Sequence, residues 1–114
     1  MKVESKPHGE KISIIKIYGA IDTQSSVLLK KEAYRQIQSG RPHVAVDLGD
    51  VGYMDSAGLG ILLQILKTAK QSKGTFCLFG VREEIMKILS ITEFDKIIDI
   101  YDTEKKTIQE LGKR

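Results

Sequence analysis

Short apolar runs alternate with amphipathic segments along the second half of this chain, and this alternation constrains the fold more than any other feature. Strands are expected at 44–48, 75–79 and 97–101, and helices at 57–71, 82–89 and 103–111. Strands that are joined through single helices run parallel, with right-handed crossovers. The pattern therefore predicts an α/β layer.

The first half of the sequence predicts a hairpin and one more helix. Within residues 11–18, apolar side chains occupy both odd and even positions, which indicates a strand that is covered on both faces. Val3 begins a short partner strand ahead of a turn at 7–9. Helical spacing starts at Thr23 and stops near Gly40, which suits a helix C-terminus. We expect an α/β fold, with a small mixed, mostly parallel sheet of about five strands and about four helices.

Size and composition fit one ordinary globular domain. The chain has 114 residues, enough to bury a core without disulfides or metal, and we expect a single domain over residues 1–114. The only cysteine, Cys77, lies in an apolar run and is interpreted as a small core residue. No apolar segment reaches the length of a membrane span and no signal peptide is evident, so the protein is expected in the cytoplasm, away from membranes.

Charge gives no sign of a nucleic-acid partner. The formal net charge is +3, from 18 basic and 15 acidic residues, and the basic residues are scattered along the sequence. The absence of heptads and of an obvious exposed apolar strand favours a monomer in the free state.

Most signatures of enzymes are missing from the sequence. His8 and His43 lie at the amino ends of strands, far from where ligands gather in an open sheet, so a serine-hydrolase site is disfavoured. The glycines after residue 57 lack the lysine of a phosphate-binding loop. Asp47, Asp50 and Asp55 could bind Mg²⁺, but the simpler interpretation places Asp50 in a turn and Asp55 at a helix cap. We expect no enzyme activity, cofactor or metal.

The stretch YMDSAGLG, residues 53–60, places a serine where a strand gives way to a helix. Asp55 and Ser56 could simply cap that helix, which would need only one of them. The following turn, Ala57 to Gly60, has almost no bulk and would form a flat, accessible surface. A phosphate on Ser56 would sit at a helix N-terminus, where an anion is tolerated, and would change the character of this surface.

These residues resemble a known family. GAIDT at 19–23, VAVDLGDVGYMDSAGLG at 44–60 and the CLFGV segment are similar to the STAS domain of bacterial anti-sigma factor antagonists, over nearly the whole chain. The resemblance implies a regulator that binds an anti-sigma factor, itself a serine kinase, and so releases a sigma factor. Phosphorylation by the kinase abolishes binding, and a serine phosphatase resets the protein.

The resemblance also implies site residues. Ser56 would be the phosphoacceptor, with Asp55 positioning its hydroxyl or capping the helix and Asp22 nearby. The implied partner-binding residues are Asp22, Thr23, Asp55, Ser56, Ala57, Gly58, Leu59 and Gly60. Family members often carry a second hydroxyl after the serine, where this chain has Ala57. Ser56 is therefore the first candidate, and the second choices are Thr23, Ser25 and Ser26.

Two alternatives stay open at this level. STAS-like domains also serve as scaffold modules of signalling or lipid-transport complexes, in which the serine is unused. A small-molecule binder or weak nucleotide hydrolase could instead use the strand-end aspartates Asp22 and Asp55. Asp22 could equally be only the cap of the first helix.

Overall fold

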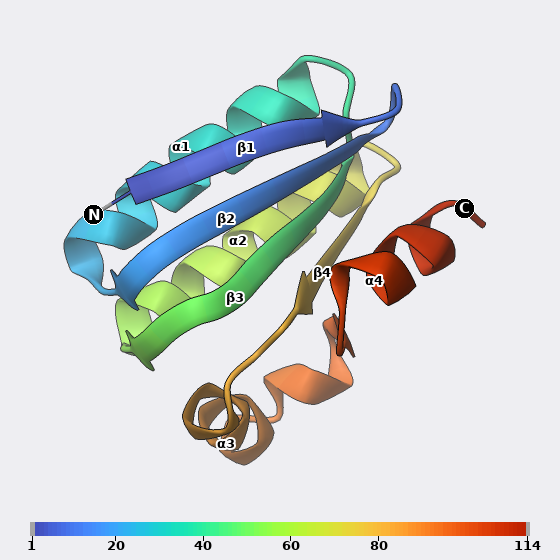
Figure 1. Ribbon diagram of the computed structural model, residues 1–114. Helices are drawn as coiled ribbons and strands as arrows, with labels where there is room; N and C mark the ends of the chain where they lie inside the picture. The colour runs from blue at the N-terminus through green and yellow to red at the C-terminus, as the bar shows by residue number, and fades with distance from the viewer. Residues whose placement is uncertain (1, 114) are drawn as a thin grey trace.

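The computed structural model describes residues 2–113, which form one five-stranded sheet with helices on both faces (Figure 1). The strands are β1 (Lys2–His8), β2 (Ile12–Ile21), β3 (His43–Met54), β4 (Thr75–Phe79) and β5 (Asp99–Tyr101). The helices are α1 (Thr23–Gln38), α2 (Ser56–Gln71), α3 (Glu83–Ile91) and α4 (Glu104–Leu111), with a 3₁₀ turn at Phe94–Lys96. The predicted fold class is confirmed.

The strands lie in the sheet in the order of the sequence. β1 pairs antiparallel with β2, whereas the β2–β3, β3–β4 and β4–β5 pairs are parallel. The carboxyl ends of β2 and β3 therefore meet at one edge of the sheet, which we call the carboxyl edge. Helices α1 and α2 both start at that edge and pack side by side behind the sheet in Figure 1.

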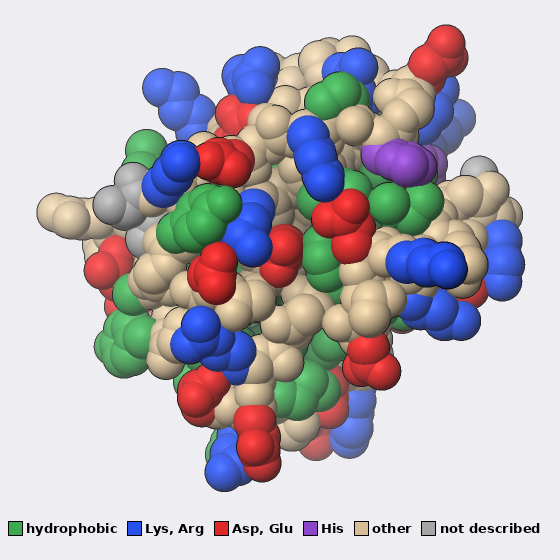
Figure 2. All heavy atoms as spheres, in the orientation of Figure 1, with side chains coloured by type: hydrophobic (Ala, Val, Ile, Leu, Met, Phe, Trp, Pro, Cys, Tyr) green, Lys and Arg blue, Asp and Glu red, His purple; other side chains and the backbone are tan. Residues whose placement is uncertain are grey.

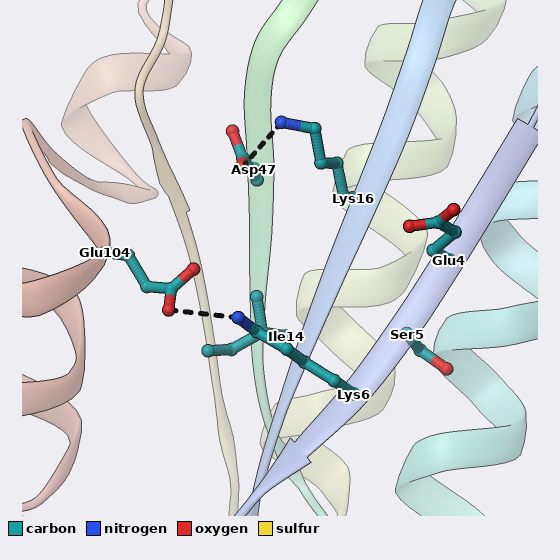
Figure 3. A pocket seen from close by; sticks show the side chains of 7 residues that line it. All are labelled: Glu4, Ser5, Lys6, Ile14, Lys16, Asp47 and Glu104. Carbon is teal, nitrogen blue, oxygen red and sulfur yellow. Dashed lines mark hydrogen bonds and ion pairs between the residues drawn. The ribbon is translucent and has the colours of Figure 1, made fainter.

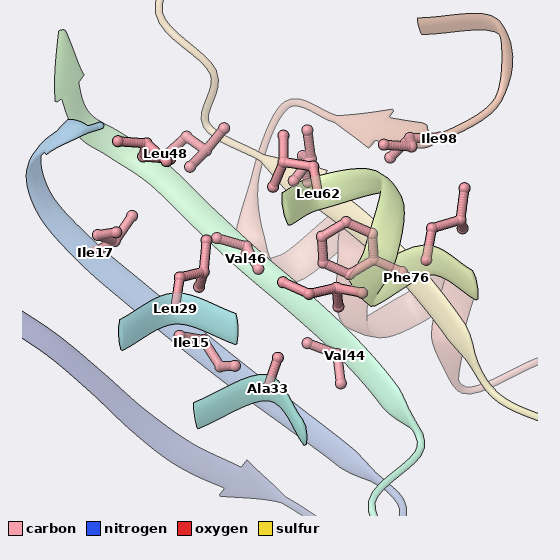
Figure 4. Packing of buried hydrophobic residues seen from close by; sticks show 14 of the residues in the cluster. Ile15, Ile17, Leu29, Ala33, Val44, Val46, Leu48, Leu62, Phe76 and Ile98 are labelled. Carbon is pink, nitrogen blue, oxygen red and sulfur yellow. The ribbon is translucent and has the colours of Figure 1, made fainter. Parts of the chain in front are cut away.

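Two apolar clusters hold the layers together. The larger one lies between the sheet and α1, α2 and α3, with Ile15, Val46 and Leu62 fully buried at its centre (Figure 4). A smaller one on the other face joins Ile12, Ala45, Phe79 and Leu111 under α4. Both faces of β2 are thus covered along its first half, as its apolar residues at both parities predicted.

The third strand is longer than the sequence predicted. It was expected to end at Leu48, but it continues to Met54, and β2 likewise continues past Tyr18 to Ile21. The pairing absorbs one extra residue of β3 at each of two register shifts, between Asp47 and Asp50 and between Asp50 and Tyr53. Bulges of this kind tolerate glycine and aspartate inside a strand. The LGDVG segment has the composition of a turn but lies within β3.

The first strand is also longer than expected. It runs from Lys2 through Pro7 to His8, and the turn follows at Gly9, whose φ is +71°. A proline is compatible with this strand because β1 lies at the sheet edge.

Candidate functional site

The carboxyl edge brings two strand-to-helix junctions together. Ile21, the last residue of β2, is paired with Met54, the last residue of β3, and an aspartate follows each strand, Asp22 or Asp55. The amide of Asp55 donates a hydrogen bond to the carbonyl of Ile21, at 3.2 Å. The N-termini of α1 and α2 are therefore neighbours, as the sequence predicted from the shared sheet edge.

Asp22 caps α1 through a reciprocal set of hydrogen bonds. Its Oδ1 accepts from the amides of Gln24 and Ser25, at 3.1 and 3.0 Å, and its own amide donates to Ser25 Oγ at 2.8 Å. The amide and hydroxyl of Ser25 hold the pKa of Asp22 below its ordinary value. Capping satisfies amides that the helix leaves unpaired, which supports the capping interpretation of Asp22.

Asp55 caps α2 in a similar way. Its Oδ1 accepts a hydrogen bond from the amide of Gly58, at 3.0 Å. Ser56 is the first residue of the helix and its side chain is exposed, whereas Ala57, Leu59 and Gly60 are partly buried. The helix was expected to start at Ala57 and begins one residue earlier. The cap thus belongs to Asp55, and the Ser56 hydroxyl is not needed for it.

The two glycines of this turn differ in their surroundings. A Cβ on Gly58 would lie 2.8 Å from the Ile21 carbonyl oxygen and 2.9 Å from Met54 Cγ. A Cβ on Gly60 would meet no atom within 4 Å. Gly58 is therefore required for the close packing of α2 against both strands, while nothing within the fold requires Gly60.

The hydroxyl groups at this edge differ sharply in accessibility. Ser25 and Ser26 are buried, with Ser25 Oγ donating to the Ala20 carbonyl at 2.6 Å and Ser26 Oγ donating to the Thr23 carbonyl at 3.0 Å. Thr23 and Ser56 are exposed. Burial excludes Ser25 and Ser26 from reaction with a folded partner, so of the predicted acceptors Ser56 and Thr23 are the accessible ones.

The other strand-end carboxylates lie elsewhere. Asp50 was expected in a turn, but it is part of β3 and lies 3.2 Å from Lys16 Nζ and 3.9 Å from Arg82. Asp47 lies 3.4 Å from the same lysine and accepts a hydrogen bond from the Gly49 amide. Across residues 2–113, the structure has no group of three or more His, Cys, Asp or Glu side chains arranged to hold a metal ion.

Exposed apolar side chains near the carboxyl edge, among them Tyr53 and Val27, were missed by sequence reasoning. Tyr53 is 56% exposed, two residues before Asp55, and Val27 is 59% exposed in the second turn of α1. Tyrosine is enriched at protein interfaces. Val27 could have been found from its position, because it falls outside the helical spacing of Leu29, Ala33 and Ile37.

A surface hollow of about 140 Å³ lies on the open face of the sheet (Figure 3), and its lining includes neither Asp22 nor Asp55. Its charged side chains already neutralise one another, since Lys6 pairs with Glu104 at 3.2 Å and Lys16 with Asp47 at 3.4 Å. The open face as a whole shows the same interspersed signs in Figure 2. The small-molecule alternative uses Asp22 and Asp55. Because neither residue lines this hollow, that alternative is weakened.

Comparison with known proteins identifies the family. The STAS domain model matches residues 5–107. The chain therefore belongs to the STAS domain family, as the DSAGLG and GAID segments suggested.

Named relatives and solved structures agree with this assignment. The chain is 33% identical over 90 residues to the anti-sigma-B factor antagonist of Listeria monocytogenes, covering 77% of each protein. It is 28% identical over 105 residues to the anti-sigma F factor antagonist of Paenibacillus polymyxa, covering 91% of this chain and 90% of that protein. The unphosphorylated anti-sigma factor antagonist SpoIIAA shares the fold, with a TM-score of 0.85 at 15% identity over 99% of this chain and 98% of that chain.

No helix within residues 2–113 is long and apolar enough to cross a bilayer.

Proposed function

We propose that this protein is an anti-sigma factor antagonist that is controlled by phosphorylation of Ser56. Its unmodified form binds an anti-sigma factor, itself a serine kinase, and so frees a sigma factor; phosphorylation ends the binding and a serine phosphatase restores it. The protein acts in the cytoplasm as substrate and ligand of the kinase, without an activity of its own. The observation that carries this proposal is the exposure of Ser56 on a helix terminus while Ser25 and Ser26 are buried.

The partner binds the surface formed by the two helix N-termini. This surface comprises Asp22, Thr23, Asp55, Ser56, Ala57, Leu59 and Gly60. Gly58 is buried beneath it and allows α2 to pack closely against the strands. An open Gly60 supports close approach of another protein, because glycine inside a helix is unfavourable by roughly 1 kcal/mol relative to alanine and the fold leaves room for a Cβ.

Phosphorylation changes this surface without refolding it. A phosphate adds about −1.5 to −2 charges at pH 7, and the free amides and dipole at a helix N-terminus favour an anion. Binding fails because the phosphate must be desolvated or repelled within the interface. A loss of only about 3 kcal/mol weakens binding more than a hundredfold. SpoIIAA, which shares this fold, has been solved in both an unphosphorylated and a phosphorylated form.

The test is phosphosite mapping with a serine kinase of the anti-sigma factor class from the same organism. Wild type and Thr23→Ala should each gain one phosphate with ATP, and Ser56→Ala should gain none. Thr23→Ala is the matched control because Thr23 is the other exposed hydroxyl among the predicted acceptors. Isothermal titration of the kinase should then show binding to unmodified protein and a loss of at least a hundredfold after modification.

Two results would contradict the proposal. A phosphate that persists in Ser56→Ala would assign the acceptor to another residue. No phosphate on wild type, with a kinase shown to be active on itself or another substrate, would favour the scaffold alternative, in which the serine is unused.

A further inference from the structure

Helices α1 and α2 form a layer with a strong net positive charge. Residues 23–41 and 56–74, which span α1, α2 and the turns after them, hold seven of the 18 basic residues and one of the 15 acidic residues. This layer has a net charge of +6, and the rest of the chain therefore carries −3. Basic residues that are scattered along the sequence are gathered by the fold onto one layer.

This charge is confined to the C-terminal parts of both helices. The first seven residues of α1, 23–29, and the first eleven of α2, 56–66, contain no charged side chain. The basic residues follow at Lys30, Lys31 and Arg35 in α1 and at Lys67 and Lys70 in α2. Both helices start at the carboxyl edge, so an uncharged zone next to Ser56 passes into a basic zone at the far end.

The two basic segments are held close together. α1 and α2 pack against each other, and Gly74, just after α2, lies so close to Pro42, just after α1, that a Cβ on the glycine would be 2.0 Å from the proline carbonyl oxygen. The C-terminal ends of the helices therefore meet, as their N-terminal ends do. We call the exposed lysines Lys31, Lys67, Lys70 and Lys73 the helical basic patch.

The four lysines of the helical basic patch are not neutralised by nearby carboxylates. Within residues 2–113, none of its four lysines forms an ion pair with a carboxylate. On the open sheet face, by contrast, Lys2, Lys6, Lys16 and Arg82 all pair with acidic side chains. The positive potential of the helical layer is therefore available to another molecule.

Helix stability does not account for this arrangement. Cations stabilise a helix only near its last turn, where they offset the negative end of the dipole. Arg35 and Lys70 are placed for that effect. Lys31 lies about two turns before the end of α1, too far from the last turn for this effect. Stabilisation of the helix therefore does not explain a lysine at this position.

On α2, Lys67 shares a face with the candidate phosphoacceptor. Residues that are spaced by four and by seven lie on one stripe of a helix, which places Ser56, Gly60 and Lys67 in line along α2. Eleven residues separate Ser56 from Lys67, a span of about 16 Å along the axis. The same spacing aligns Val27 with Lys31 on α1. A protein that covers Ser56 in an interface of ordinary size also reaches the basic patch.

We propose that the partner which binds the Ser56 surface also contacts the helical basic patch, and that it does so with an acidic region of its own surface. This inference rests on the proposed function and adds the chemistry of the partner. The uncharged zone lies against a neutral or apolar area, while the lysines attract the acidic region and speed association. An acidic partner also repels a phosphate on Ser56, so one electrostatic feature favours the unmodified protein and rejects the modified one.

The test compares two triple variants with the same net charge. Lys31→Gln/Lys67→Gln/Lys70→Gln removes the patch, and the control Lys11→Gln/Lys87→Gln/Lys105→Gln removes three exposed lysines from other surfaces. Titration at 50 mM NaCl against the anti-sigma kinase that phosphorylates Ser56 should show at least tenfold weaker binding for the patch variant than for the control. The difference should shrink at 300 mM NaCl, because salt screens exposed charges.

Each remaining outcome has a definite meaning. Equal affinities of the two triple variants for the kinase would overturn the inference and leave the proposed function intact. Patch-dependent binding to phosphatidylglycerol vesicles, with no patch effect on the kinase, would overturn it in favour of a lipid surface. A wild type that neither binds the kinase nor gains phosphate would refute the proposed function and this partner together.

Discussion

At the scale of single residues, Gly58 and Gly60 lie in the same helical turn but have different roles. Gly58 is required by the packing of the fold, whereas Gly60 is not. Gly58 faces the strands, where neighbouring atoms leave no room for a side chain. Gly60 faces outward into open space. Stability should therefore respond in opposite directions to the same substitution at these two positions.

Gly58→Ala is expected to destabilise the fold by about 1–3 kcal/mol, because overpacking against Ile21 and Met54 exceeds the gain in helix propensity. Gly60→Ala, its matched control, should stabilise by about 0.5–1 kcal/mol. Urea denaturation at pH 7 measures both. A Gly58→Ala variant as stable as wild type would show that α2 can move away from the strands freely.

Several of the site residues could be predicted, and the exceptions have physical reasons. Asp22 and Asp55 were placed correctly at the helix termini, because caps depend on local sequence. Asp50 was misplaced, because glycines beside an aspartate also suit a bulge inside a strand. The burial of Ser25 and Ser26 depends on which face α1 turns toward the sheet, and alternative acceptors could not be discarded without that information.

At the scale of elements, one polar cluster ties the edge strand β1 to helix α1. The carboxylate of Glu32 accepts hydrogen bonds from the Arg35 guanidinium, at 2.6 and 2.9 Å, from the side-chain Nε2 of Gln36 at 3.1 Å, and from the Ser5 hydroxyl. The guanidinium of Arg35 and the donors Ser5 and Gln36 lower the pKa of Glu32 to about 2 from 4.5. The ionised carboxylate of Glu32 on α1 thus binds the Ser5 hydroxyl of β1.

This cluster predicts a pH-dependent contribution to stability. A carboxylate whose pKa is depressed by folding stabilises the protein above its unfolded pKa, near 4.5, and loses that contribution as the pH falls toward 2. After allowance for solvent screening, we expect Glu32→Gln to reduce stability at pH 7 by about 1–2 kcal/mol and to flatten its decline between pH 5 and pH 2. Urea denaturation across this range measures the effect.

Glu10→Gln is the control for this experiment, because Glu10 is exposed in the turn after β1. It should follow the wild-type curve. If Glu32→Gln also follows it, the cluster does not contribute to folding.

At the scale of the whole molecule, most of the fold followed from the alternation of strands and helices, while the distribution of charge did not. β4 was predicted with its observed bounds, and the end of α1 was recognised from Gly40. The basic patch could not be read from the sequence, because Lys31 and Lys67 are 36 positions apart and belong to one layer only because α1 and α2 pack side by side.

The free protein is expected to be a monomer. The exposed edge strand β1 carries Lys2, Glu4 and Lys6 together with Pro7, and β5 at the other edge has only three residues. Charges, proline and short length all discourage edge-to-edge pairing of sheets. Light scattering after gel filtration, at tens of micromolar, should give the mass of one chain, 12.8 kDa. Twice that mass would contradict the expectation.

The antiparallel direction of β1 has a practical consequence for anyone who tethers this protein to a support or to a reporter. Lys2 pairs with Tyr18, near the carboxyl edge, whereas Gly112 lies beside His8 and Lys11 at the opposite end of the sheet (Figure 1). A linker joined ahead of Lys2 would emerge next to the surface around Ser56 and obstruct it. A linker joined after Lys113 would leave that surface clear, so it is the attachment point for immobilised binding assays.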